Sequence, residues 1–127
     1  MCIGLIQGGA TALAGVRRPI TVITGTNDEL MIANSDQYVD VDMDDYLAFM
    51  DRGNLDGLIM TMRADDPKWS FVGLDESQLV TRVVEKEVIS NEATVGIYNF
   101  RRGADFVAAA DRMIGRNLRV NNEFYVA

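Results

Sequence analysis

The segment Glu29-Leu30-Met31-Ile32-Ala33-Asn34-Ser35-Asp36-Gln37 decides the fold that the sequence predicts. Its four apolar residues in a row lack polar alternation, which is typical of a parallel strand buried on both faces. Such strands hold ligands beyond their carboxyl ends. The segment therefore predicts a central parallel strand that delivers Asp36 to the edge of the sheet where chemistry takes place. The alternative is a plain turn, because Asn, Ser and Asp all favour loops.

Composition predicts one acidic, globular domain. The chain has 127 residues and is 48% hydrophobic, which is enough for a core. Its net charge of −7 argues against nucleic acid and an anionic membrane as partners, because both would repel it. Cys2 is the only cysteine, so no intrachain disulfide can form and a cytoplasmic setting is expected. No apolar run approaches the roughly 20 residues that span a bilayer, and no signal peptide is recognisable.

The sequence contains no histidine. This excludes Ser-His-Asp and Cys-His nucleophiles, histidine-ligated zinc and an imidazole base. Any active site must therefore use carboxylates, lysine or arginine, and a metal ion. Such a set suits phosphoryl or nucleotidyl transfer, where catalysis is mostly positioning and neutralisation of charge by hard cations.

Strands and helices alternate along the chain, with one hairpin inserted. This order predicts an α/β protein with three layers, in which helices cover both faces of a mixed, mainly parallel sheet. Strands are expected at 1–6, 20–24, 56–63, 69–74, 78–85 and 93–100, and helices at 13–18, 42–53 and 104–115.

An acidic run precedes the helix expected at 42–53. Asp40, Asp42 and Asp44 can cap the helix and complement its dipole, because carboxylates accept from the free N–H groups of a first turn. The same spacing also resembles the Asp-x-Asp metal motif of nucleotide-sugar glycosyltransferases. Capping is the favoured interpretation, since acidic first turns are common.

Four segments carry a resemblance to a known family. Residues 31–37 resemble a strand whose terminal aspartate binds Mg²⁺, and Glu85-Lys86 with the following 90–98 resembles a Glu-Lys-Pro, Ser and Gly-x-Tyr segment that contacts a sugar phosphate. Residues 122–126 resemble a segment after the last helix, and 7–11 a turn that holds a nucleotide base. From Leu30 onward the chain is thus similar to the central part of a sugar-phosphate nucleotidyltransferase, the family related to glucose-1-phosphate thymidylyltransferase.

The resemblance implies a glycosyltransferase-A-like, Rossmann-like fold and a set of site residues. By it, Asp36 would bind Mg²⁺ and act with Lys86 in catalysis, where the lysine neutralises the sugar 1-phosphate. Glu85 would accept hydrogen bonds from sugar hydroxyls. The implied substrate-binding residues are Gln7, Gly8, Gly9, Glu85, Ser70 and Thr94. The residue pattern alone leaves alternatives open: Asp36 as a turn residue, Glu85-Lys86 as a solvated strand end, and Ser70 and Thr94 as ordinary strand residues.

The chain also departs from the family. The family's glycine-rich loop, whose arginine and lysine grip the triphosphate, is expected before residue 1, and a second metal-binding aspartate is expected after residue 127. Glu87 stands where the family usually has proline, and 19–27 departs from an expected helix. We therefore expect a single domain, 1–127, that is truncated at both ends and whose activity in isolation stays open.

The predicted function is transfer of a nucleotidyl group from a nucleoside triphosphate to a sugar 1-phosphate. The alternatives are a nucleotide-sugar glycosyltransferase that uses the Asp40–Asp44 run and a non-catalytic nucleotide-sugar binding or assembly module. The expected partners are a nucleotide, a sugar phosphate and a second copy of the chain, which would form a homodimer to cover a sheet edge left open.

Overall fold

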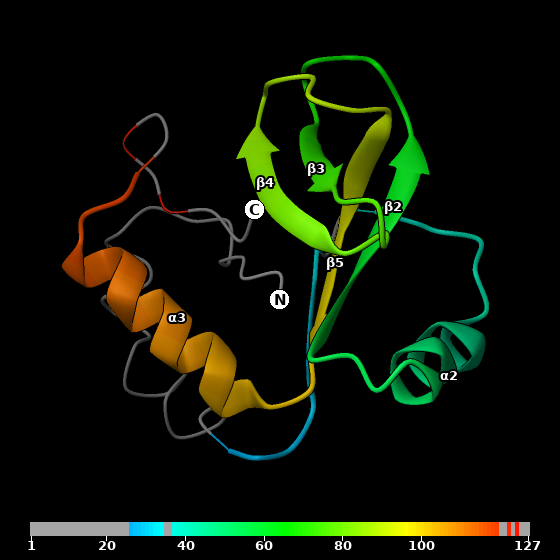
Figure 1. Ribbon diagram of the computed structural model, residues 1–127, viewed down its shortest axis with the longest axis vertical. Helices are drawn as coiled ribbons and strands as arrows, with labels where there is room; N and C mark the ends of the chain where they lie inside the picture. Colours follow the sequence, from blue (N-terminus) through cyan, green and yellow to red (C-terminus); the bar gives the residue numbers. More distant parts are fainter. Residues whose placement is uncertain (1–25, 35–36, 120–121, 123, 125–127) are drawn as a thin grey trace. The chain divides into compact units, whose positions relative to one another are not determined.

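The computed structural model describes residues 26–34, 37–119, 122 and 124 (Figure 1). These residues form two compact units. One contains the described residues from Met31 to Asn99, and the other contains those up to Leu30 and those from Phe100 onward. The strands predicted at 1–6 and 20–24 and the helix predicted at 13–18 lie outside the described residues.

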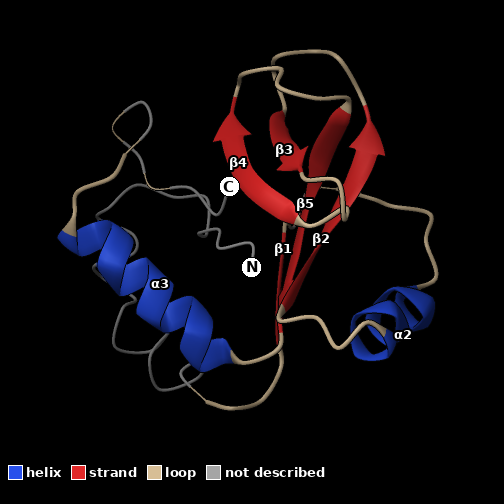
Figure 2. Cartoon of the chain, in the orientation of Figure 1, coloured by secondary structure: helices blue, strands red, loops and turns tan. Residues whose placement is uncertain are grey.

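The described residues contain a five-stranded sheet (Figure 2). Its strands are Leu30–Ala33 (β1), Gly57–Arg63 (β2), Ser70–Leu74 (β3), Val80–Glu85 (β4) and Glu92–Phe100 (β5). The order is β1-β5-β3-β4, and β2 also pairs with β5. β3 is antiparallel to both β4 and β5. Just beyond β2, the Ala64 N–H donates to the Asn91 carbonyl before β5 at 3.3 Å, as in an antiparallel pair.

The predicted α/β class is therefore wrong. The chain forms a mostly antiparallel sheet with two helices, Met43–Arg52 (α2) and Gly103–Gly115 (α3), and not a three-layer, mainly parallel, Rossmann-like fold. The reason lies in the connections. Parallel neighbours need a crossover of a dozen or more residues, usually a helix. The loop from β3 to β4, residues 75–79, is too short for that, so the chain turns back and these two strands pair antiparallel.

β1 was expected to be a central strand buried on both faces, and the expected burial is wrong: exposure alternates along the strand, with Met31 and Ala33 exposed. Among the described strands, β1 lies at one end of the strand order. A run of four apolar residues is too short to distinguish a doubly covered strand from an outer one. Asp36 lies outside the described residues, so the structure assigns it no place relative to the sheet.

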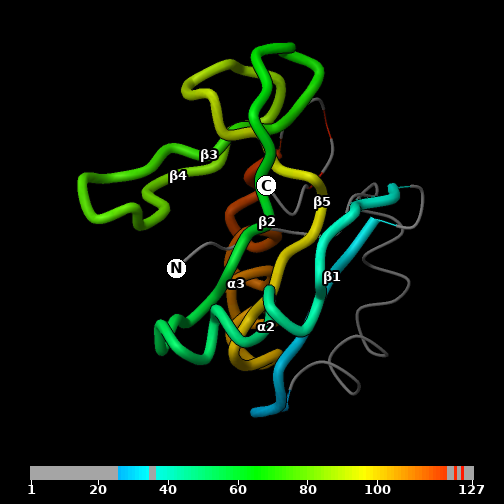
Figure 3. Tube along the Cα trace, turned by 90° about the vertical axis from the view of Figure 1, so that its right-hand side faces the viewer, coloured from blue at the N-terminus to red at the C-terminus, as the bar shows by residue number. Residues whose placement is uncertain are grey.

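β5 pairs with three of the other four strands. Residues 93–100 are all buried, and the strand pairs with β1, β2 and β3. β3 meets it at Ala93, opposite Phe71, while the Asn34 N–H at the end of β1 donates to the Gly96 carbonyl at 3.0 Å. Figure 3 shows β5 between β1 and β2, with the β3–β4 hairpin projecting from them. Since a strand has only two edges, two of its three partners share one edge at different positions.

Gly96 adopts a conformation that favours glycine, with φ +78°. A Cβ atom at this position would overlap the Asn34 side chain and lie 3.0 Å from Gln37 Oε1. The absence of a side chain therefore lets the segment after β1 lie directly against the β5 backbone.

α2 packs against the sheet through an apolar cluster. Met60, Val95 and Ile97 form its buried part, and Val39, Met43, Tyr46 and Met62 pack around them. The helix begins after Asp42, whose Oδ1 accepts from the Asp44 and Asp45 N–H groups at 2.9 and 3.2 Å. This confirms the helix predicted at 42–53 and the capping role of Asp42.

The second unit is built on α3. Phe100 and Phe106 pack with their ring centroids 5.2 Å apart. The residue before the helix, Arg102, provides no side-chain cap. Instead, the first helical N–H groups, those of Gly103 and Ala104, donate to the carbonyls of Asp28 and Thr26 at 2.9 and 2.8 Å. Within the described residues, no helix has the length and apolar character needed to cross a membrane.

Replacing Gly96 by alanine should lower the free energy of unfolding by about 2 kcal/mol or more, because the change combines backbone strain with overlap. Gly115→Ala is the matched control: no atom lies within 4 Å of the new methyl, so its effect should stay within about 1 kcal/mol. Urea denaturation measures both. Equal stability of Gly96→Ala and the wild type would show that the close approach is not required.

Asp42→Ala should cost about 1 kcal/mol of stability through loss of the cap, whereas Asp42→Asn should cost less because asparagine also caps helices. Asp40→Ala, at an exposed position before the helix, provides the control. Thermal denaturation followed by circular dichroism compares the three. A cost for Asp40→Ala as large as that for Asp42→Ala would argue against capping as the cause.

Candidate functional site

Ser70 and Glu85 meet at one end of the β3–β4 hairpin. The antiparallel register places them opposite each other, and the Ser70 hydroxyl donates to Glu85 Oε2. Both side chains are partly buried. The structure therefore brings together two of the residues that the sequence predicted for sugar-phosphate binding.

Lys86 follows directly and has an unusual backbone. Its N–H donates to the Trp69 carbonyl at 3.1 Å, which extends the pairing of the two strands by one step. Its φ is +56°, a value that few residues other than glycine, asparagine and aspartate adopt. The lysine is exposed, and its ammonium group forms no ion pair with another described residue. Ser70 and Glu85 are joined by a hydrogen bond and Lys86 follows Glu85 in the sequence; the three residues are named here the hairpin-end site.

Thr94 lies in a different environment. It is 5% exposed within β5, and its Oγ1 lies 3.1 Å from the Tyr98 hydroxyl. Among the described residues, its hydroxyl bonds to Tyr98 and not to Ser70 or Glu85. This contact places Thr94 in the interior of the unit, away from the exposed lysine.

The other predicted site residues lie outside the described residues: Gln7, Gly8, Gly9 and Asp36. Of the segment 122–126, only residues 122 and 124 are described. Within the described part of the chain, no group of three or more acidic, histidine or cysteine side chains is arranged to hold a metal ion. Mg²⁺ binding at Asp36 stays a prediction.

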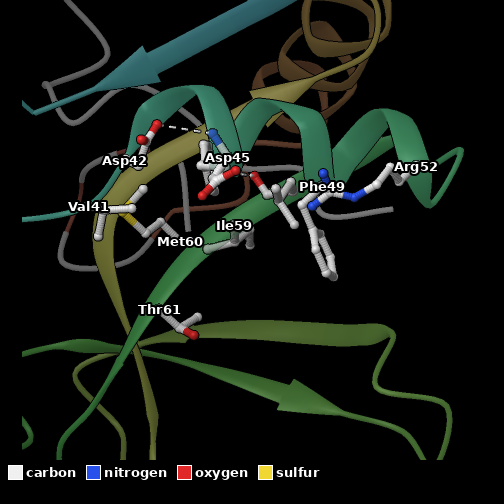
Figure 4. Close-up of a pocket in the computed structure, with 10 residues that line it drawn as sticks. Val41, Asp42, Asp45, Phe49, Arg52, Ile59, Met60 and Thr61 are labelled. Atoms are coloured by element: carbon white, nitrogen blue, oxygen red, sulfur yellow. Dashed lines mark hydrogen bonds between the residues drawn. The ribbon is translucent and has the colours of Figure 1, made fainter.

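A groove between α2 and β2 was not anticipated from the sequence (Figure 4). It has a volume of about 540 Å³. Tyr46 lines it, and its hydroxyl donates to the Leu58 carbonyl at 3.1 Å. Burial raises the pKa of Tyr46 above its ordinary value. Phe49, which is 56% exposed, also lines this groove.

A second pocket, lined by Arg63 and Arg82, also escaped the sequence analysis. The two arginines are 19 residues apart in the sequence. No local motif links them, and only the pairing of the strands brings them to one pocket.

Comparison with known proteins identifies no relative: no protein-family model matches the chain, and no curated protein matches it. The resemblance to sugar-phosphate nucleotidyltransferases therefore rests on the residues of the chain itself.

Tyr46 should make stability fall at alkaline pH. Because its pKa is raised by burial, the unfolded chain loses the phenol proton first, near the ordinary value of about 10. Stability is then complete below that pH and declines as pH rises towards the pKa of the folded state. Urea denaturation between pH 8 and pH 11 should show a smaller decline for Tyr46→Phe. Tyr38→Phe is the control. Because Tyr38 is 90% exposed, this substitution should leave the dependence of stability on pH unchanged. Identical profiles for the wild type and Tyr46→Phe would contradict this account.

Proposed function

We propose that the chain binds a sugar phosphate at the hairpin-end site and belongs to a sugar-phosphate nucleotidyltransferase-like protein that joins a nucleotide to that sugar. The observation that supports the proposal is the hydrogen bond from Ser70 to Glu85, with Lys86 directly beside it. Ser70 and Glu85, two residues that the sequence assigned to one ligand, lie opposite each other at one end of two paired strands, and the third, Lys86, is the next residue in the chain.

The chemistry of the three side chains suits the two parts of such a ligand. An ionised carboxylate accepts about four hydrogen bonds. The serine uses one of these sites on Glu85, and the remainder can accept from sugar hydroxyls. The ammonium group of Lys86 offers three donors and a positive charge to a phosphate. In a chain of net charge −7, this local cation favours an anionic ligand.

In the proposed reaction, an oxygen of the sugar 1-phosphate attacks the α-phosphorus of the nucleoside triphosphate and pyrophosphate leaves. Lys86 holds the attacking phosphate, and Glu85 orients the sugar through its hydroxyls. Mg²⁺, where bound, offsets the charge that develops on the transferred phosphate. Asp36 would hold the ion, because a carboxylate is the hard oxygen ligand that Mg²⁺ prefers.

The second candidate is the non-catalytic binding module. Binding of a sugar phosphate needs only a cation and hydrogen-bond acceptors, such as Lys86 and Glu85 offer. The glycosyltransferase alternative has less support, because Asp42 already accepts two backbone N–H groups as a helix cap.

The proposal includes a cytoplasmic setting and a homodimer. For the dimer, the support is β1, which is the outer strand among those that the structure describes and presents Met31 to solvent. Outer strands with exposed apolar side chains favour pairing with another chain.

Glucose 1-phosphate serves as the probe in a calorimetric titration of the full chain. Lys86→Asn should weaken binding by about tenfold or more, because a charge-assisted contact is lost while asparagine tolerates the positive φ. Glu85→Gln should also weaken binding, because an amide oxygen accepts hydrogen bonds from the sugar hydroxyls less strongly than a carboxylate does. Lys68→Asn and Glu87→Gln are the matched controls: Lys68 is exposed and pairs with Asp66, and Glu87 is an exposed neighbour.

Equal affinities for Lys86→Asn and Lys68→Asn would contradict the proposed site. A pyrophosphate-release assay with a nucleoside triphosphate and Mg²⁺ separates the two candidates. Mg²⁺-dependent release supports nucleotidyl transfer. Saturable binding without release supports the binding module.

A further inference from the structure

The pocket near the tip of the β3–β4 hairpin, named here the arginine pocket, differs from the rest of the chain in charge. It has a volume of about 480 Å³ and contains Arg63, Arg82 and Glu92 as its charged lining residues. The neutral lining includes Gln78 and Asn91. Two positive charges and one negative charge converge there, in a protein that is strongly acidic overall.

The one carboxylate of the pocket is already engaged. Glu92 Oε1 lies 3.1 Å from an Arg63 nitrogen, and Glu92 Oε2 accepts from the Thr61 hydroxyl at 2.8 Å. The Glu92 side chain is only 19% exposed. Arg63 and Glu92 therefore neutralise each other, and the charge that stays uncompensated belongs to Arg82.

The Arg82 side chain forms no ion pair or hydrogen bond with another described residue, yet packing restricts it. It pairs across the strands with Gly73. A Cβ atom on Gly73 would lie 3.0 Å from Arg82 Cγ, 3.4 Å from its Nε and 3.4 Å from Ile89 Cδ1. The arginine stem therefore lies over the glycine, next to the isoleucine. A guanidinium positioned in this way loses less conformational freedom when it binds a ligand.

The groups left free in the pocket are mainly donors. The Ser90 hydroxyl donates to the Val72 carbonyl and that of Thr81 to the Gly73 carbonyl. Arg82 keeps five N–H donors, and the Asn91 side chain, which bonds to no other described residue, adds two. These donors outnumber the roughly four acceptor positions of a carboxylate. A phosphate group, with three terminal oxygens, matches them better.

The arginine pocket is separate from the hairpin-end site. Arg82 and Glu85 are three residues apart in β4, and Gly73 and Ser70 are three apart in β3. Side chains alternate between faces along a strand, so each pair points to opposite faces. The register shift in this hairpin comes after Gly73 and leaves the alternation between these residues intact.

We propose that the arginine pocket is a second ligand site, which binds the phosphate group of a small organic phosphate. Arg82 supplies the charge and a planar fork of donors, and Asn91 adds amide donors. Arg63 positions Glu92 so that the carboxylate does not compete for Arg82. The volume of the pocket leaves room for an organic group attached to the phosphate.

The test is a nuclear magnetic resonance titration of the full chain with inorganic phosphate at low ionic strength, where screening of an exposed arginine is weak. The Arg82 Nε–Hε and Asn91 side-chain amide signals should shift and saturate. Arg82→Gln should weaken the apparent affinity by about tenfold or more, since a charge-assisted fork is lost. Arg52→Gln, an exposed arginine at the end of α2, is the matched control and should leave the affinity unchanged.

Asn91→Ala offers a second variant that leaves the strands untouched, and it should weaken the affinity about threefold by removing the neutral amide donors. Sodium chloride at matched ionic strength and sodium acetate are the comparison titrations, and neither should reproduce the saturating shifts. Equal affinity of the wild type and Arg82→Gln would overturn the proposal. So would shifts that chloride reproduces, or tighter binding of acetate than of phosphate.

Discussion

The larger unit depends on the burial of β5. A buried strand must satisfy its backbone polar groups within the protein, because an unpaired one costs about as much as a lost hydrogen bond. β5 meets this requirement with three partner strands. One of these partners is β1. Gly96 has a positive φ and no side chain, and this allows Asn34 at the end of β1 to lie against the β5 backbone. A larger residue would separate the end of β1 from the strand on which it depends.

The same strand sets the position of both proposed sites. β5 meets β3 at Ala93 and Phe71, and Phe71 and Val72 are fully buried, so each face of β3 is covered near its middle. Burial on both faces specifies the register, since a shift by one residue would exchange the two faces. With the register set, Ser70 and Glu85 point to one face of the hairpin and Gly73 and Arg82 to the other. The separation of a sugar-phosphate site from an arginine pocket therefore follows from packing that is remote from both.

Electrostatics gives these sites a common character. The chain is acidic, and in its described part Arg63 pairs with Glu92, Lys68 with Asp66 and Arg102 with Asp105. Lys86 and Arg82 have no such partner among the described residues. Both are held where the hairpin backbone or a neighbouring glycine restricts them. A cation that is restricted in position and free of a counter-ion attracts anions more effectively than a flexible surface lysine.

The sequence by itself determined the local elements. The four strands β2 to β5 and both described helices lie within two residues of the predicted ranges, because alternation, turn residues and caps such as Asp42 act over a few residues. The β3–β4 hairpin, which places Ser70 opposite Glu85, was also predicted from local turn residues. Only the tertiary structure decided that the sheet is mostly antiparallel, that β1 comes last in the order of the described strands, and that Arg82 lies over Gly73. These features come from strand pairing between distant residues, and a single strand's pattern of apolar residues is the same whichever neighbour it pairs with.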